Sequence, residues 1–525
     1  MKGIHRFAMP VFALCAASCL FTLSTGAAAA PAAPQLLFEQ INVEQGLSQS
    51  IVTNIMQDRR GYLWFGTEDG LNLYDGYGFS VLRTDPDNPH SLSYNQITAL
   101  YEDRAGSIWA GTFNGGLNRY LLEKNRFIRF RTAPADTSSL SNDLIYAIVQ
   151  DRAGQLWVGC DHGLNRMKNP HAAEGSGRFD RFFHSPGDKA SLRDDHVRAL
   201  AVDSIGTLWA GTDQGLAMLP AAELLHDKPR FTVPEMQEKE WNALAQDTIR
   251  TLMVDRSGAL WIGAVHGLHC LRREPGRPPR LQSFFHAPGN PRTLSNNHVY
   301  ALLEDAEGNI WVGTEGGLNR FDPRSGEFAA WLNDPRNPHS LSHNEIRSLF
   351  QDRSGLLWVG TYGGGVSKAD ARPKPFVHYR YLPEVPEGLS QPIIWSIYED
   401  ANGILWIGTH GGGLDRLERR TGRYTHYRAN PADPHSLSHN IVRLVIPGRD
   451  GELWIGTHGG GICRFNPATG RFVRYLHDPQ NPYSLCHNEI RALFLDSDST
   501  LWIGTQGGGL DRLDTRKLNT ASPRF

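Results

Sequence analysis

Residues 346–370 read IRSLFQDRSGLLWVGTYGGGVSKAD, and this stretch decides the fold. Its first seven residues alternate apolar and polar side chains, which predicts a half-buried strand. Asp352 and Gly355 are the first and fourth residues of a predicted tight turn, because an aspartate bonds back to the backbone and a glycine tolerates positive φ at these places. Leu356–Thr361 and Val366–Asp370 predict two more strands. The stretch therefore predicts three consecutive strands joined by tight turns.

This pattern recurs ten times along the chain. The repeat reads I-x-x-L-x-x-D-x-x-G-x-L-W-x-G-T-x-x-G-L-x-R, followed by a variable stretch and then N-P-x-S-L-S-x-N. A period near 48 residues fits a four-stranded propeller blade, which cannot bury both of its faces alone and has to stack on its neighbours. The sequence therefore predicts an all-β fold, a β-propeller of ten four-stranded blades, with the repeated tryptophan packed between adjacent blades. These tryptophans are Trp64, Trp109, Trp157, Trp209, Trp261, Trp311, Trp358, Trp406, Trp454 and Trp502.

Ten blades can be arranged in two ways. Asp370–Phe376 contains two prolines, as a linker does, and Leu36–Val43 resembles the outer strand of a blade. If Leu36–Val43 pairs with the seventh blade, residues 31–372 form a closed seven-bladed propeller without exposed edge strands, and residues 373–525 form three blades of an incomplete second one. In the alternative, the same strand completes the tenth blade of a single ten-bladed ring. We favour the first arrangement, because propellers usually have four to eight blades.

The N-terminus predicts export from the cytoplasm. Lys2, His5 and Arg6 precede an apolar stretch from Phe7 to Leu23, and small residues follow it, so residues 1–30 are interpreted as a signal peptide. The apolar stretch has about 17 residues, which is short for a membrane span. We expect a periplasmic or secreted protein without direct membrane insertion.

The composition is that of a globular protein, with 40% hydrophobic and 21% charged residues. The formal net charge of −2 provides no electrostatic attraction for nucleic acid or for an anionic membrane surface. We therefore expect no nucleic-acid partner.

The sequence also resembles a known family. Residues 38–50, FEQINVEQGLSQS, and residues 58–76, DRRGYLWFGTEDGLNLYDG, are similar to the two-component regulator propeller. The resemblance implies a periplasmic sensor, in which two seven-bladed propellers usually precede an immunoglobulin-like module, a membrane helix and a cytoplasmic histidine kinase or diguanylate cyclase. No stretch of this chain resembles a kinase or cyclase motif. The resemblance therefore implies a signal-input module, either truncated or served by a membrane-bound kinase or cyclase partner.

Ligand-binding residues are expected in the G-T-x-x-G turns, because these turns and the loops between blades lie at one end of a propeller. Residues common to all blades hold the fold, whereas the turn tips differ from blade to blade. Small polar groups with one aromatic residue suit a neutral polar ligand such as a saccharide or a peptide. The alternative is that the tips are solvated turn residues. The candidates are Glu68, Asn114, Asp161, His162, Gln214, His266, Glu315, Tyr362, His410 and His458.

Two classes of function stay open. The favoured one is a non-catalytic ligand sensor of a two-component or cyclic-di-GMP signalling system. The alternative is a propeller enzyme such as a streptogramin-lyase-like lyase, for which His162 with Asp161 is the best acid/base candidate, although neither has a visible partner. The candidate histidines stand in different blades without the close spacing of a zinc site, so we predict no metal and no cofactor.

Overall fold

The computed structural model describes residues 36–171, 177–234, 244–273, 277–372, 379–383, 385–518 and 524–525. The predicted signal peptide, residues 1–30, lies outside the described residues. The chain divides into two compact units, Met1–Pro373 (unit 1) and Lys374–Phe525 (unit 2). The assignment of these units as one complete and one incomplete propeller domain stays a prediction. No helix in the described part of the chain is long and apolar enough to cross a membrane.

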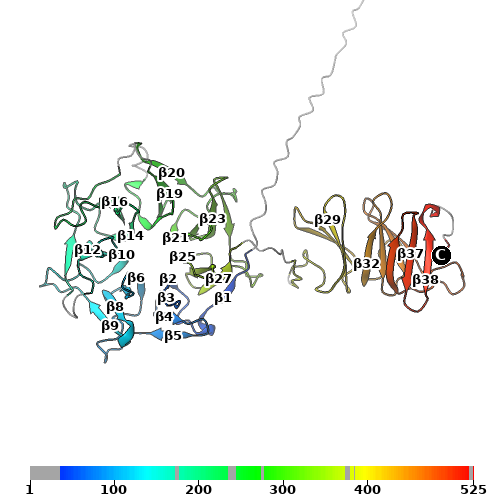
Figure 1. Cartoon of the computed structure of the whole chain (residues 1–525), viewed down its shortest axis with the longest axis horizontal. Helices are drawn as coiled ribbons and strands as arrows, with labels where there is room; N and C mark the ends of the chain where they lie inside the picture. The colour runs from blue at the N-terminus through cyan, green and yellow to red at the C-terminus, as the bar shows by residue number, and fades with distance from the viewer. Residues whose placement is uncertain are drawn as a thin grey trace, which may run out of the picture. The chain divides into compact units, whose positions relative to one another are not determined.

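Unit 1 contains seven antiparallel sheets, and the all-β fold is confirmed (Figure 1). Each repeat contributes its strands in sequence order, with the seventh sheet completed by β1. Two short 3-10 helices, η1 (Val43–Gln45) and η2 (Leu122–Lys124), connect strands. The strands are, sheet by sheet, β2 (Val52–Gln57), β3 (Leu63–Thr67), β4 (Gly70–Tyr74), β5 (Phe79–Leu82); β6 (Ile97–Glu102), β7 (Ile108–Thr112), β8 (Leu117–Leu121), β9 (Arg126–Phe130); β10 (Ile145–Gln150), β11 (Leu156–Cys160), β12 (Leu164–Met167), β13 (Phe179–Phe182); β14 (Val197–Val202), β15 (Leu208–Thr212), β16 (Gly215–Leu219); β17 (Ile249–Val254), β18 (Leu260–Ala264), β19 (Gly267–Arg272), β20 (Arg280–Phe284); β21 (Val299–Glu304), β22 (Ile310–Thr314), β23 (Gly317–Asp322), β24 (Glu327–Trp331); and β25 (Ile346–Gln351), β26 (Leu356–Thr361), β27 (Val366–Asp370), β1 (Glu39–Ile41).

Unit 2 contains three more sheets of the same kind, followed by the 3-10 helix η3 (Thr515–Lys517). Their strands are β28 (Ile394–Glu399), β29 (Ile404–Thr409), β30 (Leu414–Glu418), β31 (Arg423–Tyr427); β32 (Val442–Pro447), β33 (Leu453–Thr457), β34 (Ile462–Asn466), β35 (Arg471–Tyr475); and β36 (Ile490–Leu495), β37 (Thr500–Thr505), β38 (Leu510–Asp514).

Two of the ten sheets depart from the predicted four strands. The fourth and tenth sheets have three strands within the described residues. In the fourth repeat, Met218 forms only an isolated bridge with Thr232 where a fourth strand would pair. Pro220 and Pro229 stand between these two residues, and proline lacks the N–H that a strand ladder requires.

The first strands of the unit 1 sheets surround a common axis. Each first strand lies beside the first strand of the next sheet, and β25 of the seventh sheet lies beside β2 of the first (Figure 1). β1 pairs antiparallel with β27, with Ile41 opposite Val366, and gives the seventh sheet its outer strand. The side chain of Gln40 also donates to the carbonyl of Ser340 at 3.2 Å.

The repeated tryptophans pack between adjacent sheets, as predicted. Trp157, for example, contacts Val197 and Leu208 of the following sheet and is fully buried. All the repeated tryptophans from Trp64 to Trp454 are buried, whereas Trp502 of the tenth sheet is partly exposed. The hydrophobic core is therefore a series of layers between sheets, each centred on one indole.

An aspartate of the turn holds the indole in nine of the ten repeats. Its Oδ2 accepts a hydrogen bond from the indole Nε1 six residues later, at 2.7–3.1 Å. The other oxygen organises the turn: Asp352 Oδ1 accepts from the backbone N–H groups of Ser354 and Leu356, at 2.9 and 3.0 Å. The constant aspartate thus has a second role besides the predicted turn. Only the ninth repeat lacks it, because Gly448 stands in its place.

One buried histidine of unit 1 is expected to make its stability depend on pH. His269 on β19 is 1% exposed, and its Nδ1 lies 2.8 Å from Ser283 Oγ. Its Nε2 has no hydrogen-bond partner within the described residues. Burial lowers the pKa of His269 to about 4, against the opposing attraction of Asp247. In four other repeats this position holds a neutral asparagine, as at Asn72.

We expect acidification from about pH 7.5 to about pH 5 to lower the free energy of unfolding by about 2 kcal/mol through His269. The folded-state pKa lies below the unfolded value of about 6.5, so this stability is present above pH 6.5 and is lost as the pH falls toward 4. The measurement is urea unfolding of the wild type and of His269→Asn across this range. An equal loss in both proteins would show that His269 is not the titrating group.

Candidate functional site

The turn tips of unit 1 lie next to the starts of the first strands. The backbone N–H of Asp161 donates to the carbonyl of Leu144 at 3.0 Å, and that of Tyr362 donates to the carbonyl of Glu345 at 2.9 Å. Leu144 and Glu345 immediately precede β10 and β25, which surround the axis. The tips therefore lie at the end of the axis where the first strands begin.

Each first strand also carries a β-bulge at its second residue. In β10 the register shifts between Ile145 and Ala147, so that Tyr146 is the extra residue, and β17 and β25 shift in the same way at Arg250 and Arg347. A bulge redirects a side chain out of the regular alternation. The second residues from β10 to β25 are Tyr146, Arg198, Arg250, Tyr300 and Arg347.

These bulge residues stack on one another as cation–π pairs. The guanidinium of Arg198 lies 4.8 Å from the ring centroid of Tyr146. Arg250 and Arg347 lie 5.3 and 4.2 Å from the centroid of Tyr300, and Arg347 also lies 4.9 Å from that of the turn residue Tyr362. Each such contact is attractive because the face of an aromatic ring is electron-rich. Three arginines and two tyrosines thus occupy the bulge positions of five neighbouring first strands of unit 1, and Thr53 and Thr98 occupy those of the other two.

Arg198 and Arg347 are neutralised by neighbouring carboxylates. Arg198 Nη2 lies 2.7 Å from Asp213 Oδ2, and this pairing raises the pKa of Arg198. Arg347 pairs with Glu345. Within the described residues Arg250 has no carboxylate partner, and its Nε has no acceptor although it is buried. Arg250 is therefore the guanidinium at this end of unit 1 that can bind an added acceptor without losing an ion pair.

The eight predicted site residues of unit 1 fall into three groups. Those engaged by neighbouring loops or strands are Glu68 with Gln96 at 3.3 Å, Asp161 with Tyr146 at 2.9 Å, His162 with Asp195 at 3.5 Å, His266 with Asp247 at 2.9 Å and Glu315 with His298 at 2.8 Å. Asn114 and Gln214 make hydrogen bonds through their backbone atoms. The carbonyl of Asn114 accepts from Arg131 Nη2 at 3.1 Å, and the N–H of Gln214 donates to Thr212 Oγ1 at 3.2 Å. Tyr362 is 42% exposed and packs on Arg347.

His410 and His458 belong to unit 2, apart from the eight candidates of unit 1. His410 lies 6.0 Å from the ring of Trp395, and His458 Nδ1 lies 2.9 Å from Glu489 Oε1. The ten predicted residues are thus divided between two compact units.

One group near the tips could ligate a metal ion by its residue types. Asp194, His196 and Asp213 each place one potential ligand atom within 4.8 Å of the others. Asp213 is already bonded to Arg198, and His196 Nδ1 lies 3.0 Å from Asp194 Oδ1. A metal ion bound here would have to compete with the guanidinium of Arg198 for Asp213. We therefore interpret this group as a set of ion pairs and hydrogen bonds, not as a metal site.

Sequence reasoning missed the bulge residues, although it contained the signal for them. The residue after the first isoleucine or valine of each repeat varies from blade to blade, while its neighbours repeat. The rule applied to the turn tips, that recognition lies where equivalent positions differ, also selects Tyr146, Arg250 and Arg347. The fold is thus a β-propeller, and the variable turn tips and bulge residues of unit 1 lie at one end of its axis.

The family model described as "Two component regulator propeller" matches eight of the ten repeats, and the chain belongs to this family. The matched residues are 46–69, 91–114, 139–162, 191–214, 293–316, 340–363, 388–411 and 484–507.

Two solved structures of similar proteins are extracellular domains. One, assigned to the hybrid two component system BT3049 of B. thetaiotaomicron, is 25% identical with a TM-score of 0.71, over 94% of this chain and 60% of that one. Another, assigned to the one component system BT4673 of the same organism, is 23% identical with a TM-score of 0.50, over 93% of this chain and 60% of that one, and supports the fold. Histidine kinase P4 of Formosa agariphila is 46% identical over 57 residues, 11% of this chain and 4% of the kinase. The chain thus spans less than two thirds of each of these relatives.

Proposed function

We propose that this protein is the periplasmic signal-input module of a two-component or cyclic-di-GMP signalling system, non-catalytic itself, and that unit 1 binds a small polar ligand at the axial end. The similarity to extracellular domains of two-component systems supports the sensor role. A membrane-bound histidine kinase or diguanylate cyclase is the proposed partner. Export by residues 1–30 is part of this proposal. Cell fractionation is expected to recover the mature protein in the periplasmic fraction.

The observation that carries the proposal is the guanidinium of Arg250, which stacks on the ring of Tyr300 and has no carboxylate partner in the described part of the chain. Aromatic rings provide flat apolar contacts, and an arginine without a partner provides donors at a fixed place. This combination suits a saccharide or a peptide that presents a hydroxyl or carbonyl oxygen to Arg250 while its apolar face packs on Tyr300 or Tyr362.

A panel of neutral trisaccharides and amidated tripeptides tests the proposal by thermal shift of the mature protein. A ligand that binds only the folded state raises the melting temperature with concentration. An unchanged melting temperature across the whole panel would remove the support for a saccharide or peptide ligand.

For a panel member that binds, we expect Arg250→Ala to weaken affinity by about tenfold or more, because a hydrogen bond to a charged group contributes about 1.5–3 kcal/mol. The measurement is isothermal titration calorimetry. Arg292→Ala is the matched control, because Arg292 is half-exposed and pairs with Glu327 at 3.0 Å away from the bulge residues. Equal affinities of Arg250→Ala and the wild type would contradict the proposed site.

A further inference from the structure

The turn of the ninth repeat differs in shape from the others. Gly448 replaces the repeated aspartate, and the backbone N–H of Glu452 donates to the carbonyl of Arg449 at 2.9 Å. The two residues between them, Asp450 and Gly451, have φ of 52° and 78°. Two consecutive residues with positive φ are typical of the type I′ turn of a two-residue hairpin. This turn therefore places no carboxylate beneath the indole of its repeat.

Trp454 has lost its hydrogen-bond acceptor as a result. Its side chain belongs to the layer between the ninth and tenth sheets and is 2% exposed. No group within the described residues accepts from its Nε1, whereas the other nine indoles each bond an aspartate. An indole N–H that bonds no group of the protein within the described residues is available for an acceptor from outside.

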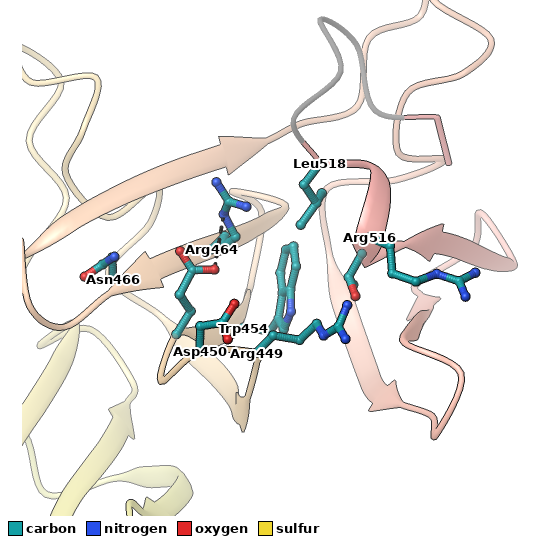
Figure 2. A pocket seen from close by; sticks show the side chains of 9 residues that line it. Arg449, Asp450, Trp454, Arg464, Asn466, Arg516 and Leu518 are labelled. Atoms are coloured by element: carbon teal, nitrogen blue, oxygen red, sulfur yellow. Dashed lines mark ion pairs between the residues drawn. The ribbon is translucent and has the colours of Figure 1, made fainter.

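A pocket of about 370 Å³ opens beside Trp454. Figure 2 shows the indole in the middle of the view, with Arg449 and Asp450 at one end and Arg464 and Leu518 at the other. Its volume falls in the range of small-molecule sites, and its walls come from the ninth turn, β34 and the segment that follows β38.

The charges of this pocket leave one cation and one carboxylate unpaired. Arg464 faces Glu452 at 3.6 Å, and Arg516 pairs with Asp514 at 2.8 Å. Arg449, which is exposed, has no carboxylate partner in the described part of the chain, and Asp450 has no cation. The pocket thus offers an indole N–H and a guanidinium to an acceptor, and a carboxylate to a donor.

We propose that this pocket binds a small organic carboxylate that carries a hydrogen-bond donor beside the carboxylate, the chemistry shared by sugar acids and α-amino acids. The ligand carboxylate takes the place of the missing aspartate, accepts from Trp454 Nε1 and faces Arg449. Its hydroxyl or ammonium group faces Asp450. A phosphate dianion is disfavoured, because Asp450 and Glu452 line the same pocket and repel the additional charge. This site lies in unit 2 and is independent of the site proposed in unit 1.

Calorimetric titration of the full mature protein with D-galacturonate, L-alanine, acetate and neutral D-galactose tests this inference. We expect galacturonate or alanine to bind, and the one that binds shows whether the ligand is a sugar acid or an α-amino acid. Acetate is expected to bind more weakly and galactose not at all. Absence of binding by galacturonate, alanine and acetate would overturn the proposal.

Three variants locate the ligand within the chain. Trp454→Phe keeps the ring without the N–H, and Arg449→Ala removes the exposed guanidinium; each is expected to weaken binding about tenfold or more. Gly448→Asp supplies the carboxylate within the protein and is expected to abolish binding and to raise the melting temperature. A Cβ at Gly448 would lie 3.1 Å from the carbonyl oxygen of Glu452, so the turn has to shift by a few tenths of an ångström.

Trp406→Phe is the matched control, because its indole is already bonded to Asp400 at 3.0 Å. It is expected to leave the affinity unchanged. Wild-type affinity in Trp454→Phe and in Arg449→Ala would overturn the proposal, and loss of binding only in Arg250→Ala would place the ligand in unit 1. Since Arg449 is exposed, its variant reports on binding even if a substitution at Gly448 or Trp454 impairs folding.

Discussion

Trp157→Ala is expected to lower the free energy of unfolding by about 3–5 kcal/mol, because it removes a large buried ring and leaves a cavity. Trp157 is fully buried between the third and fourth sheets, where Phe182 stacks on it with ring centroids 5.7 Å apart. Arg166 covers its ring at 5.5 Å and is itself buried, so the surrounding groups cannot easily move into the space.

The measurement for Trp157→Ala is equilibrium unfolding in guanidinium chloride, followed by far-UV circular dichroism. Tyr77→Ala is the control, because Tyr77 is 98% exposed and its loss is expected to change stability by no more than about 0.5 kcal/mol. A loss below about 1 kcal/mol at Trp157 would show that the layers between sheets do not determine stability.

Asp103→Ala is expected to cost about 3 kcal/mol, because it leaves several buried donors without an acceptor. Asp103 is 1% exposed; its Oδ2 accepts from Trp109 Nε1 at 2.7 Å, and its Oδ1 accepts from the backbone N–H groups of Ala105 and Ser107, both at 2.9 Å. The substitution thus breaks the bond to the indole and the turn at once.

The same denaturation experiment applies to Asp103→Ala, with Asp87→Ala as its control. Asp87 lies in an exposed loop, so removing its carboxylate tests for a general effect of lost negative charge. Comparable stability of the two variants would contradict the assigned role of the repeated aspartate.

The fold could be predicted because its determinants are local and repeated. Alternating strands, the Asp–Gly turn and the tryptophan recur at a near-constant period, and together they specify sheets that have to stack. The fourth sheet has three strands within the described residues, where Pro220 and Pro229 interrupt the segment that follows its third strand.

The candidate site could be predicted only in part, because it depends on contacts between distant repeats. The turn tips of unit 1 lie at the end of the axis where the first strands begin, but most of them are engaged by neighbouring loops or strands. Arg250 and Tyr300 meet because bulges in two different strands redirect them toward each other. The unpaired Trp454 could have been found from the sequence only after the role of the aspartate was known, since Gly448 then marks the exception.

The pairing of β1 with β27 has a consequence for the order of folding. Gln40 donates a hydrogen bond to Ser340, which lies 300 residues later in the chain. The strand β1 can therefore pair with β27 only after the other sheets of unit 1 have been synthesised. The entropy of closing so long a loop must be offset before the seventh sheet gains its outer strand, which makes this a slow step. Until β1 pairs with β27, the seventh sheet lacks its outer strand and presents an open edge. We therefore expect the folding chain to be prone to aggregation at this open edge until β1 and β27 have paired.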